Sequence, residues 1–194
     1  MIILNGLTAG YAVCGSFCTI ADSLKQIPVL KAMGMNIIPI LSNNVYSTDN
    51  RFNNAQNLRD EIENLSGNKI IHTVTGAEPI GPKKLLDILI ISPCTGNTLA
   101  KLANGITDTS VTMAAKAHLR SNRPLVICLA SNDAMSANLK NISTMLSRKH
   151  VYFVPLRQDD PIGKPHSLVA DFSLLENTLH AAVNGEQYQR VFIE

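Results

Sequence analysis

The chain of 194 residues has no tryptophan, few aromatic residues and little charge. Aromatic residues make up 5% of it and charged residues 16%, and the formal net charge is only +2. Lys and Arg gather only in pairs such as Lys83-Lys84 and Arg148-Lys149, which we interpret as solvated surface, so no nucleic-acid partner is expected. Hydrophobic residues make up 45%, which excludes a disordered chain and is typical of a protein covered by packed helices or by further subunits.

Several sequence patterns that mark particular sites are missing. The cysteines Cys14, Cys18, Cys94 and Cys128 form no CxxC pair, so neither a disulfide framework nor a structural zinc site is expected. The histidines lack a spacing such as HExxH, and we predict no metal site. A GxxxxGK[ST] motif for a nucleoside triphosphate and a GxGxxG fingerprint for a dinucleotide are also missing.

Long apolar runs are missing as well. None approaches the roughly 20 residues that a membrane-spanning helix needs, and the segment 1–6 lacks the basic residues that begin a signal peptide. The expected location is therefore the cytoplasm, with no membrane partner.

Short apolar runs alternate with helical periodicity along the chain. We predict strands over 7–13, 36–41, 88–91, 124–129 and 151–155, and a short extended piece over 69–74. Helices are predicted over 19–33, 55–65, 99–106, 109–119, 137–146 and 168–183; Thr19 caps the first, Asp22 lies in its first turn, and Pro28 kinks it. The polar segments 42–54 and 157–166 are predicted loops. This alternation predicts one α/β domain over residues 1–194, a three-layer αβα, Rossmann-like, doubly wound fold with a mostly parallel sheet.

The turn after the run Ile88 to Ile91 consists of small residues that form hydrogen bonds. Thr95, Asn97 and Thr98 carry side-chain donors, and Gly96 lets the backbone approach a ligand closely. In an open α/β sheet, ligands bind at the carboxyl ends of strands, where the first amides of the following helix point outward. The turn therefore predicts a phosphate site, although in isolation such residues are also ordinary helix caps.

Three further turns of small neutral residues follow other predicted strands: Cys14-Gly15-Ser16, Ser42-Asn43-Asn44 and Ala130-Ser131-Asn132. Neutral donors at a helix start bind phosphate without the lysine of a P-loop. Together the four turns favour a cofactor with one phosphate and a polyhydroxyl chain.

These turns resemble the flavoprotein family of homo-oligomeric flavin-containing cysteine decarboxylases and flavin prenyltransferases. The matching residues are Gly15-Ser16, Ser42, Pro93 to Thr98, Lys101, Ala103, Gly105, Asp108, Met113 to Lys116 and Arg123 to Val126. The resemblance implies bound FMN. Because the flavin of these relatives lies between subunits, it also implies a homo-oligomer, either a trimer or a dodecamer.

The same resemblance implies roles for individual residues. Gly15 and Ser16 would contact the ribityl-phosphate region, and Ser42 the phosphate or the ribityl chain. The implied cofactor-binding set is Gly15, Ser16, Ser42, Pro93, Cys94, Thr95, Gly96, Asn97, Thr98 and Ser131. Cys94 has two interpretations, a nucleophile at a helix start or a small residue packed beside the cofactor.

A narrower resemblance rests on the runs 48–52, 77–84, 94–97 and 152–155. They are similar to one component of a bacterial synthase, built from two kinds of polypeptide, that oxidises a dihydropyridine-type dicarboxylate to an aromatic product during sporulation. The implied activity is that of an oxidoreductase, in which a nicotinamide-binding companion polypeptide holds NADP. The alternatives are a flavin-dependent decarboxylase or prenyltransferase on the same fold, and a non-catalytic partner of the synthase.

A small dicarboxylate substrate needs cationic groups, and the guanidinium fork of arginine matches a carboxylate best. Arg51 is the first candidate, and Lys164 and Arg157 follow on the loop 157–166, which could act as a lid. Asp49 is a candidate base, or alternatively a turn residue that holds Arg51. For each of these charged residues the ordinary alternative is solvated surface.

Overall fold

The computed structural model of the chain describes residues 4–194, so the first three residues of the segment 1–6 lie outside it. Its central sheet runs in the order β2-β1-β3-β4, and these strands are parallel. Their bounds are β1 (Thr8–Val13), β2 (Asn36–Leu41), β3 (Ile88–Cys94) and β4 (Leu125–Ser131). The strand predicted over 88–91 is confirmed in β3, which is buried along its whole length because helices cover both sides of the sheet.

The outer edge of β4 is shared by two strands. Its first half pairs in parallel with β5 (Val151–Phe153), and its end pairs antiparallel with β7 (Leu168–Ala170). A further strand, β6 (Leu156–Arg157), pairs antiparallel with β7. The predicted mostly parallel α/β sheet is therefore confirmed, with an antiparallel addition at one edge.

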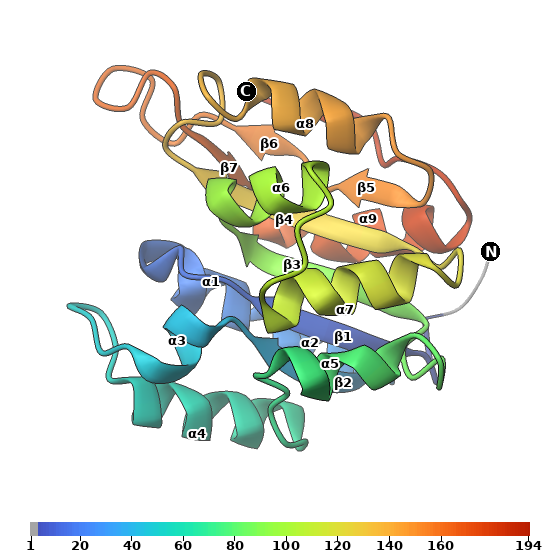
Figure 1. Cartoon of the computed structure of the whole chain (residues 1–194). Helices are drawn as coiled ribbons and strands as arrows, with labels where there is room; N and C mark the ends of the chain where they lie inside the picture. The colour runs from blue at the N-terminus through green and yellow to red at the C-terminus, as the bar shows by residue number, and fades with distance from the viewer. Residues whose placement is uncertain (1–3) are drawn as a thin grey trace.

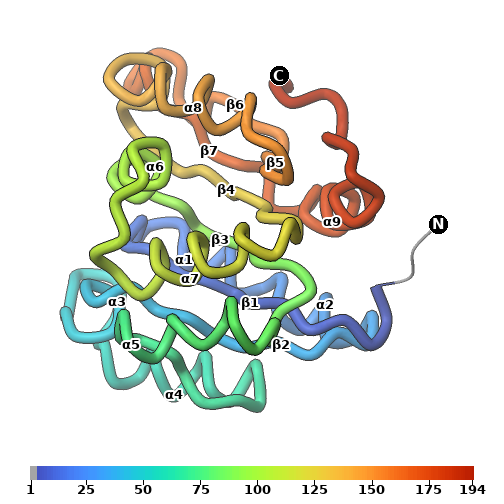
Figure 2. Tube along the Cα trace, turned by 45° about the vertical axis from the view of Figure 1, so that its right-hand side comes forward, coloured from blue at the N-terminus to red at the C-terminus, as the bar shows by residue number. Residues whose placement is uncertain are grey.

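Helices cover both faces of the sheet (Figure 1). One face carries α1 (Ile20–Leu24), α2 (Gln26–Ala32) and α9 (Leu175–Val183), and the other carries α5 (Val74–Ala77), α6 (Gly96–Ala103), α7 (Ser110–Leu119) and α8 (Leu139–Leu146). Beyond β2 lie α3 (Asn43–Ser47) and α4 (Ala55–Ser66), and α4 packs against α2. Short 3-10 turns occupy Phe17–Thr19, Glu78–Ile80 and Phe172–Leu174. Figure 2 shows the three layers from a second direction.

The predicted helix over 168–183 is wrong at its start. Residues 168–170 form the strand β7, because the end of β4 offers them a hydrogen-bonding partner. The Asp171 side chain then accepts a hydrogen bond from the Ser173 amide at 3.1 Å, and this contact starts the helical segment after the strand.

The predicted helix over 19–33 is two helices, α1 and α2, that meet at Lys25. Pro28 explains the break, because it has no N–H and its ring would collide with the carbonyl of Leu24, four residues earlier. The prediction that Thr19 caps α1 with its side chain is wrong; its hydroxyl lies 3.0 Å from the Ser16 carbonyl oxygen instead. Asp22 does lie in the first turn.

Three smaller predictions also differ from the structure. The polar segment 42–54 contains a helix, α3, and the extended piece 69–74 forms one bridge, from Ile71 to Ile40, before α5 begins. The helix predicted to reach Ile106 ends at Ala103, because Gly105 takes a left-handed conformation with φ 71°. Within residues 4–194, every helix is too short or too polar to span a bilayer.

Candidate functional site

The candidate site lies at the carboxyl ends of β1 and β3. The chain leaves β1 toward α1 on one face of the sheet, and it leaves β3 toward α6 on the opposite face (Figure 1). Where the segments after two neighbouring strands leave toward opposite faces, a crevice opens between them, and open α/β sheets bind ligands there. Two adjoining hollows occupy this crevice, and Gly15 and Thr95 line both.

The smaller hollow, of about 300 Å³, is lined largely by neutral side chains. Its residues are Gly15, Ser42, Asn43, Asn44, Thr95, Asn97, Thr98, Lys101 and Thr109. The single cation among them, Lys101, is already paired, with its Nζ 2.8 Å from Asp108. This hollow therefore offers hydrogen-bond donors rather than a free charge.

The start of α6 supplies two donors to the crevice, the Asn97 amide at this hollow and the Gly96 amide at the adjoining one. The Thr95 side chain caps the helix by accepting a hydrogen bond from the Thr98 amide at 3.2 Å. Among residues 4–194, no acceptor takes the amides of Gly96 and Asn97, the first two residues of the helix. They are the amides that a helix start presents to an anion.

The Ser42 hydroxyl supplies a third donor. Its oxygen is buried and has no hydrogen-bond partner within the described part of the chain. Ser42 stands at the N-cap position of α3, but its side chain makes no capping hydrogen bond. A buried hydroxyl without a partner is rare in a folded protein, and a ligand in the adjoining hollow would satisfy it.

Two residues of the implied cofactor-binding set lie away from the hollows, and a third, Thr98, lines the smaller hollow but has its hydroxyl turned inward. The Thr98 hydroxyl donates to Cys14 Sγ at 3.3 Å and accepts from the Thr95 hydroxyl at 3.0 Å, so its contacts are internal. Pro93 and Cys94 are buried in β3 and line neither hollow. Burial raises the pKa of the Cys94 thiol well above its ordinary value, which favours the packing interpretation of this cysteine over the nucleophile.

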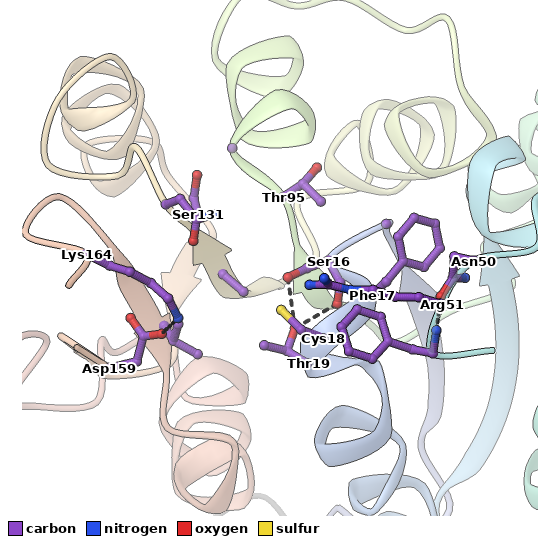
Figure 3. A pocket seen from close by; sticks show the side chains of 16 residues that line it. Ser16, Phe17, Cys18, Thr19, Asn50, Arg51, Thr95, Ser131, Asp159 and Lys164 are labelled. Atoms are coloured by element: carbon purple, nitrogen blue, oxygen red, sulfur yellow. Dashed lines mark hydrogen bonds and ion pairs between the residues drawn. The ribbon is translucent and has the colours of Figure 1, made fainter.

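The larger cavity, of about 480 Å³, lies on the other side of Gly15 and Thr95. It brings together Ser16, Gly96 and Ser131 from three of the predicted turns. Figure 3 shows Asn50 and Arg51 on one side of this cavity and Asp159 and Lys164 on the opposite side. Cys18, Phe17, Phe52 and Val169 complete much of its wall.

Two of the three predicted cations, Arg51 and Lys164, reach this cavity, but in different states. Lys164 Nζ lies 2.7 Å from Asp159, so its charge is balanced, and this contact raises the pKa of Lys164. The Arg51 guanidinium lies over the Phe52 ring, 4.7 Å from its centroid. In the described range 4–194 no carboxylate lies within ion-pair distance of Arg51, so it is the cation that can bind an anionic ligand.

Asp49 has a structural role. Its carboxylate accepts hydrogen bonds from the Ala55 amide at 2.8 Å and from Asn54 Nδ2 at 3.1 Å, which fixes the start of α4. It does not line the larger cavity and makes no contact that holds Arg51; the predicted turn is formed by Asn50, whose Oδ1 accepts from the Phe52 amide at 2.9 Å.

Arg157 lies outside the larger cavity. Its Nη1 is 3.6 Å from the Asp171 carboxylate, and it lines a neighbouring hollow between α1 and β7. The loop 158–167 does contribute Asp159 and Lys164 to the larger cavity, so part of the predicted lid segment borders the site.

Sequence reasoning did not identify Asn50 or Asn138 as contributors to the larger cavity and its wall. Asn50 lines the larger cavity, and its buried Nδ2 has no partner within residues 4–194. Behind Ser131, the Asp133 carboxylate accepts hydrogen bonds from Asn138 Nδ2 at 2.9 and 3.0 Å. The only signal for Asn50 is its position between two charged candidates, and Asn138 is too far from the turn in sequence to be associated with it.

Comparisons with known proteins show the family to which the chain belongs. The family model described as Flavoprotein matches residues 2–173. The chain is 41% identical over 194 residues to the B subunit of dipicolinate synthase from Bacillus subtilis (strain 168), covering all of this chain and 97% of that protein. The crystal structure of the B subunit of dipicolinate synthase from Bacillus halodurans C superposes with a TM-score of 0.91 at 38% identity, covering 100% of this chain and 99% of that one.

A more distant structure shares the fold. The FMN-dependent cysteine decarboxylase SpaF superposes with a TM-score of 0.68 at 23% identity, over 92% of this chain and 98% of that one. The match to the Flavoprotein model and the 41% identity over the whole chain confirm the family resemblance predicted from the four turns. The chain belongs to the flavoprotein family, in which it is similar over its whole length to the B subunits of dipicolinate synthases.

Proposed function

We propose that this protein is the FMN-binding subunit of a dipicolinate synthase, and that it takes part in oxidising a dihydrodipicolinate-type intermediate to dipicolinate during sporulation. Its proposed partner is the A subunit of dipicolinate synthase, which holds NADP. The observation that carries the proposal is a set of donors without partners within residues 4–194. The Asn97 amide and the Ser42 hydroxyl border the smaller hollow, and the Gly96 amide borders the adjoining larger cavity.

These donors fit the phosphate of a mononucleotide. Hydrogen bonds from neutral donors at a helix start stabilise a phosphate, and a paired Lys101 leaves no excess positive charge that would favour a triphosphate. The two hollows share Gly15 and Thr95, so a ligand whose phosphate lies in the smaller one can extend into the larger one. When bound, FMN supplies a two-electron acceptor, which the aromatisation of a dihydropyridine ring requires.

One side of the larger cavity, formed by Asn50 and Arg51, offers donors suited to the substrate's carboxylates. Arg51 is the cation there that has no ion-pair partner among residues 4–194, and its guanidinium can donate two parallel hydrogen bonds to a carboxylate. The Asn50 Nδ2 donor beside it has no partner within the described residues and can add a further hydrogen bond. Lys164 already has the Asp159 carboxylate as a partner and is a weaker candidate.

The first test is flavin binding by the purified, flavin-free protein. We expect FMN to bind at least roughly tenfold more tightly than riboflavin, because each hydrogen bond to a charged group contributes about 1.5–3 kcal/mol. Flavin fluorescence quenching measures both affinities. Riboflavin and FMN binding equally well would contradict the assignment of the smaller hollow to a phosphate.

The second test is product formation. The chain is combined with the A subunit, NADP and a source of the dihydro substrate, and dipicolinate is followed with and without FMN. Arg51→Ala should raise KM for the substrate at least about tenfold, and Arg51→Lys should recover only part of the loss because ammonium lacks the planar fork. Dipicolinate formation that needs the chain but not FMN would instead favour the non-catalytic partner role, and carbon dioxide release would favour a decarboxylase.

The proposed assembly is a homo-oligomer, either a trimer or a dodecamer, in which neighbouring copies cover the crevice. Sedimentation of the chain, alone and together with its companion from the synthase, measures its mass directly. A monomer in both conditions would contradict this part of the proposal.

A further inference from the structure

A chain of hydrogen bonds stands behind Ser131 in the wall of the larger cavity. Asn141 Nδ2 donates to Asn138 Oδ1 at 2.8 Å, and Asn138 Nδ2 donates to both oxygens of the Asp133 carboxylate. The Ser131 hydroxyl donates to the same carboxylate. Asn138 and Asn141 are buried, so the far end of the chain is fixed by packing.

The direction of these hydrogen bonds decides what Ser131 can offer a ligand. A hydroxyl has one hydrogen to donate and two lone pairs that accept. The hydrogen bond from Ser131 is the main cause of a lowered pKa of Asp133, so the carboxylate is ionised at neutral pH and can only accept. The hydrogen of the Ser131 hydroxyl is therefore committed to Asp133, and lone pairs of its oxygen remain for the cavity.

The hydrogen-bonded group of Ser131, Asp133 and Asn138 also has a fixed position relative to α6. A Cβ atom added to Gly96 would lie 2.6 Å from Asn138 Nδ2 and 2.8 Å from Asp133 Oδ1, and it would collide with the Ser131 hydroxyl. The hydrogen-bonded group is therefore in close contact with the backbone at the start of α6. Ser131 and Gly96 both line the larger cavity at this contact.

We propose that Ser131 is a hydrogen-bond acceptor that selects a ring N–H of the ligand in the larger cavity, and that Asp133 is a positioning residue that holds it in this state. The inference rests on the proposed function, in which the cavity receives the flavin ring and the substrate ring. Either ring can supply the N–H. A ligand with an acceptor or a methyl group at that position would be disfavoured, because the Ser131 oxygen would then face a group that cannot donate.

The experiment compares binding of FMN and 3-methyl-FMN, in which the ring imide N–H is replaced, to four proteins: the wild type, Ser131→Ala, Asp133→Asn and Ser136→Ala. Ser136→Ala is the matched control, because the Ser136 hydroxyl contacts only the main-chain oxygen of Asp133 at 3.2 Å. Asp133→Asn keeps the size of the side chain. Its amide can donate to Ser131 and so turn the serine hydrogen toward the cavity.

We expect the wild type and Ser136→Ala to prefer FMN over 3-methyl-FMN by roughly fivefold to 20-fold, as one hydrogen bond allows. Ser131→Ala and Asp133→Asn should lose this preference, and its loss in Asp133→Asn excludes simple relief of a steric clash. The four proteins could instead bind both flavins with the same affinity. In that case the KM for the dihydro substrate decides: a KM raised in Ser131→Ala and Asp133→Asn, but not in Ser136→Ala, supports the substrate as the source of the N–H.

Three outcomes would overturn the inference. The first is a preference for FMN that persists in Ser131→Ala and Asp133→Asn. The second is a flavin affinity and a KM that are the same in all four proteins. Either result would overturn the role of Ser131 and leave the proposed function standing. A wild type that binds neither flavin would overturn the proposed function, and this assignment with it.

Discussion

Replacing Ser42 by alanine should change the stability of the flavin-free protein and its affinity for FMN in opposite directions. The buried Ser42 hydroxyl has no partner in the described chain, and an unsatisfied buried group of this kind costs about 1–3 kcal/mol. A serine at an N-cap normally contributes about 1 kcal/mol through its side chain, but Ser42 makes no capping hydrogen bond, so alanine loses nothing there. Ser42→Ala should therefore stabilise the flavin-free protein by about 1 kcal/mol.

In a chain of this length, 1 kcal/mol corresponds to a rise in Tm of roughly 2–4 °C. FMN affinity should fall roughly tenfold to 100-fold, because one hydrogen bond to a charged phosphate is lost. Thermal unfolding of the flavin-free protein measures the first effect, and fluorescence titration with FMN measures the second. The combination is diagnostic, because a hydroxyl with a purely structural role cannot raise stability when it is removed.

Ser47→Ala is the matched control for this experiment. Ser47 lies at the other end of the same helix, and its exposed hydroxyl contacts the Asn43 carbonyl at 2.8 Å without lining either hollow. It should leave FMN affinity unchanged. A lower Tm together with an unchanged FMN affinity in Ser42→Ala would refute the assignment of this hydroxyl to the phosphate.

Three other substitutions test the crevice and the core at the opposite end of the sheet. Asn97→Asp places a carboxylate in the smaller hollow, where like charges about 5 Å apart repel by about 3 kcal/mol at an effective dielectric constant of 20. FMN affinity should therefore fall about 100-fold, while riboflavin affinity is unchanged. An equal loss of affinity for both flavins would contradict a phosphate contact. Gly96→Ala should destabilise the protein by about 1–3 kcal/mol in urea unfolding, because the added methyl displaces the group behind Ser131; unchanged stability would show that this group moves freely. Burial is the main cause of a pKa of His118 lowered to about 4, with Nε2 donating to the Pro124 carbonyl at 2.9 Å. The unfolded state then binds the extra proton first, so stability should fall by about 3 kcal/mol as the pH drops from about 6.5 to 4, and His118→Gln should lack this part of the decline; parallel pH profiles of the two proteins would refute it.

The fold could be predicted from local patterns where each pattern has one physical solution. The run Ile88 to Ile91 is apolar on both faces, and only a central parallel strand buries it. The segment 168–170 could not be assigned in the same way. Its apolar residues suit either a helix or a strand, and a neighbour distant in sequence, the end of β4, decides between them.

The candidate site shows the same limit. The turns with Gly15, Ser42 and Thr95 could be brought together from sequence, because the carboxyl ends of parallel strands share one edge of the sheet. Which of their groups remain free depends on local hydrogen bonds, and these turned the Thr98 hydroxyl inward while leaving that of Ser42 unpaired within residues 4–194. Asp49 shows the same limit for a charged residue. It is a candidate base in the sequence, but its carboxylate accepts a hydrogen bond from the Ala55 amide at the start of a helix.

The exchange of partners along the edge of β4 separates two parts of the molecule that can vary independently. The segments that follow the parallel strands β1, β2 and β3 line the smaller hollow, whereas the hairpin of β6 and β7 carries Asp159 and Lys164 to the larger cavity. The connection between these two hairpin strands can change in length or charge without shifting the register of the parallel strands. A protein built in this way can acquire a new substrate by remodelling one peripheral loop, while its cofactor chemistry is inherited intact.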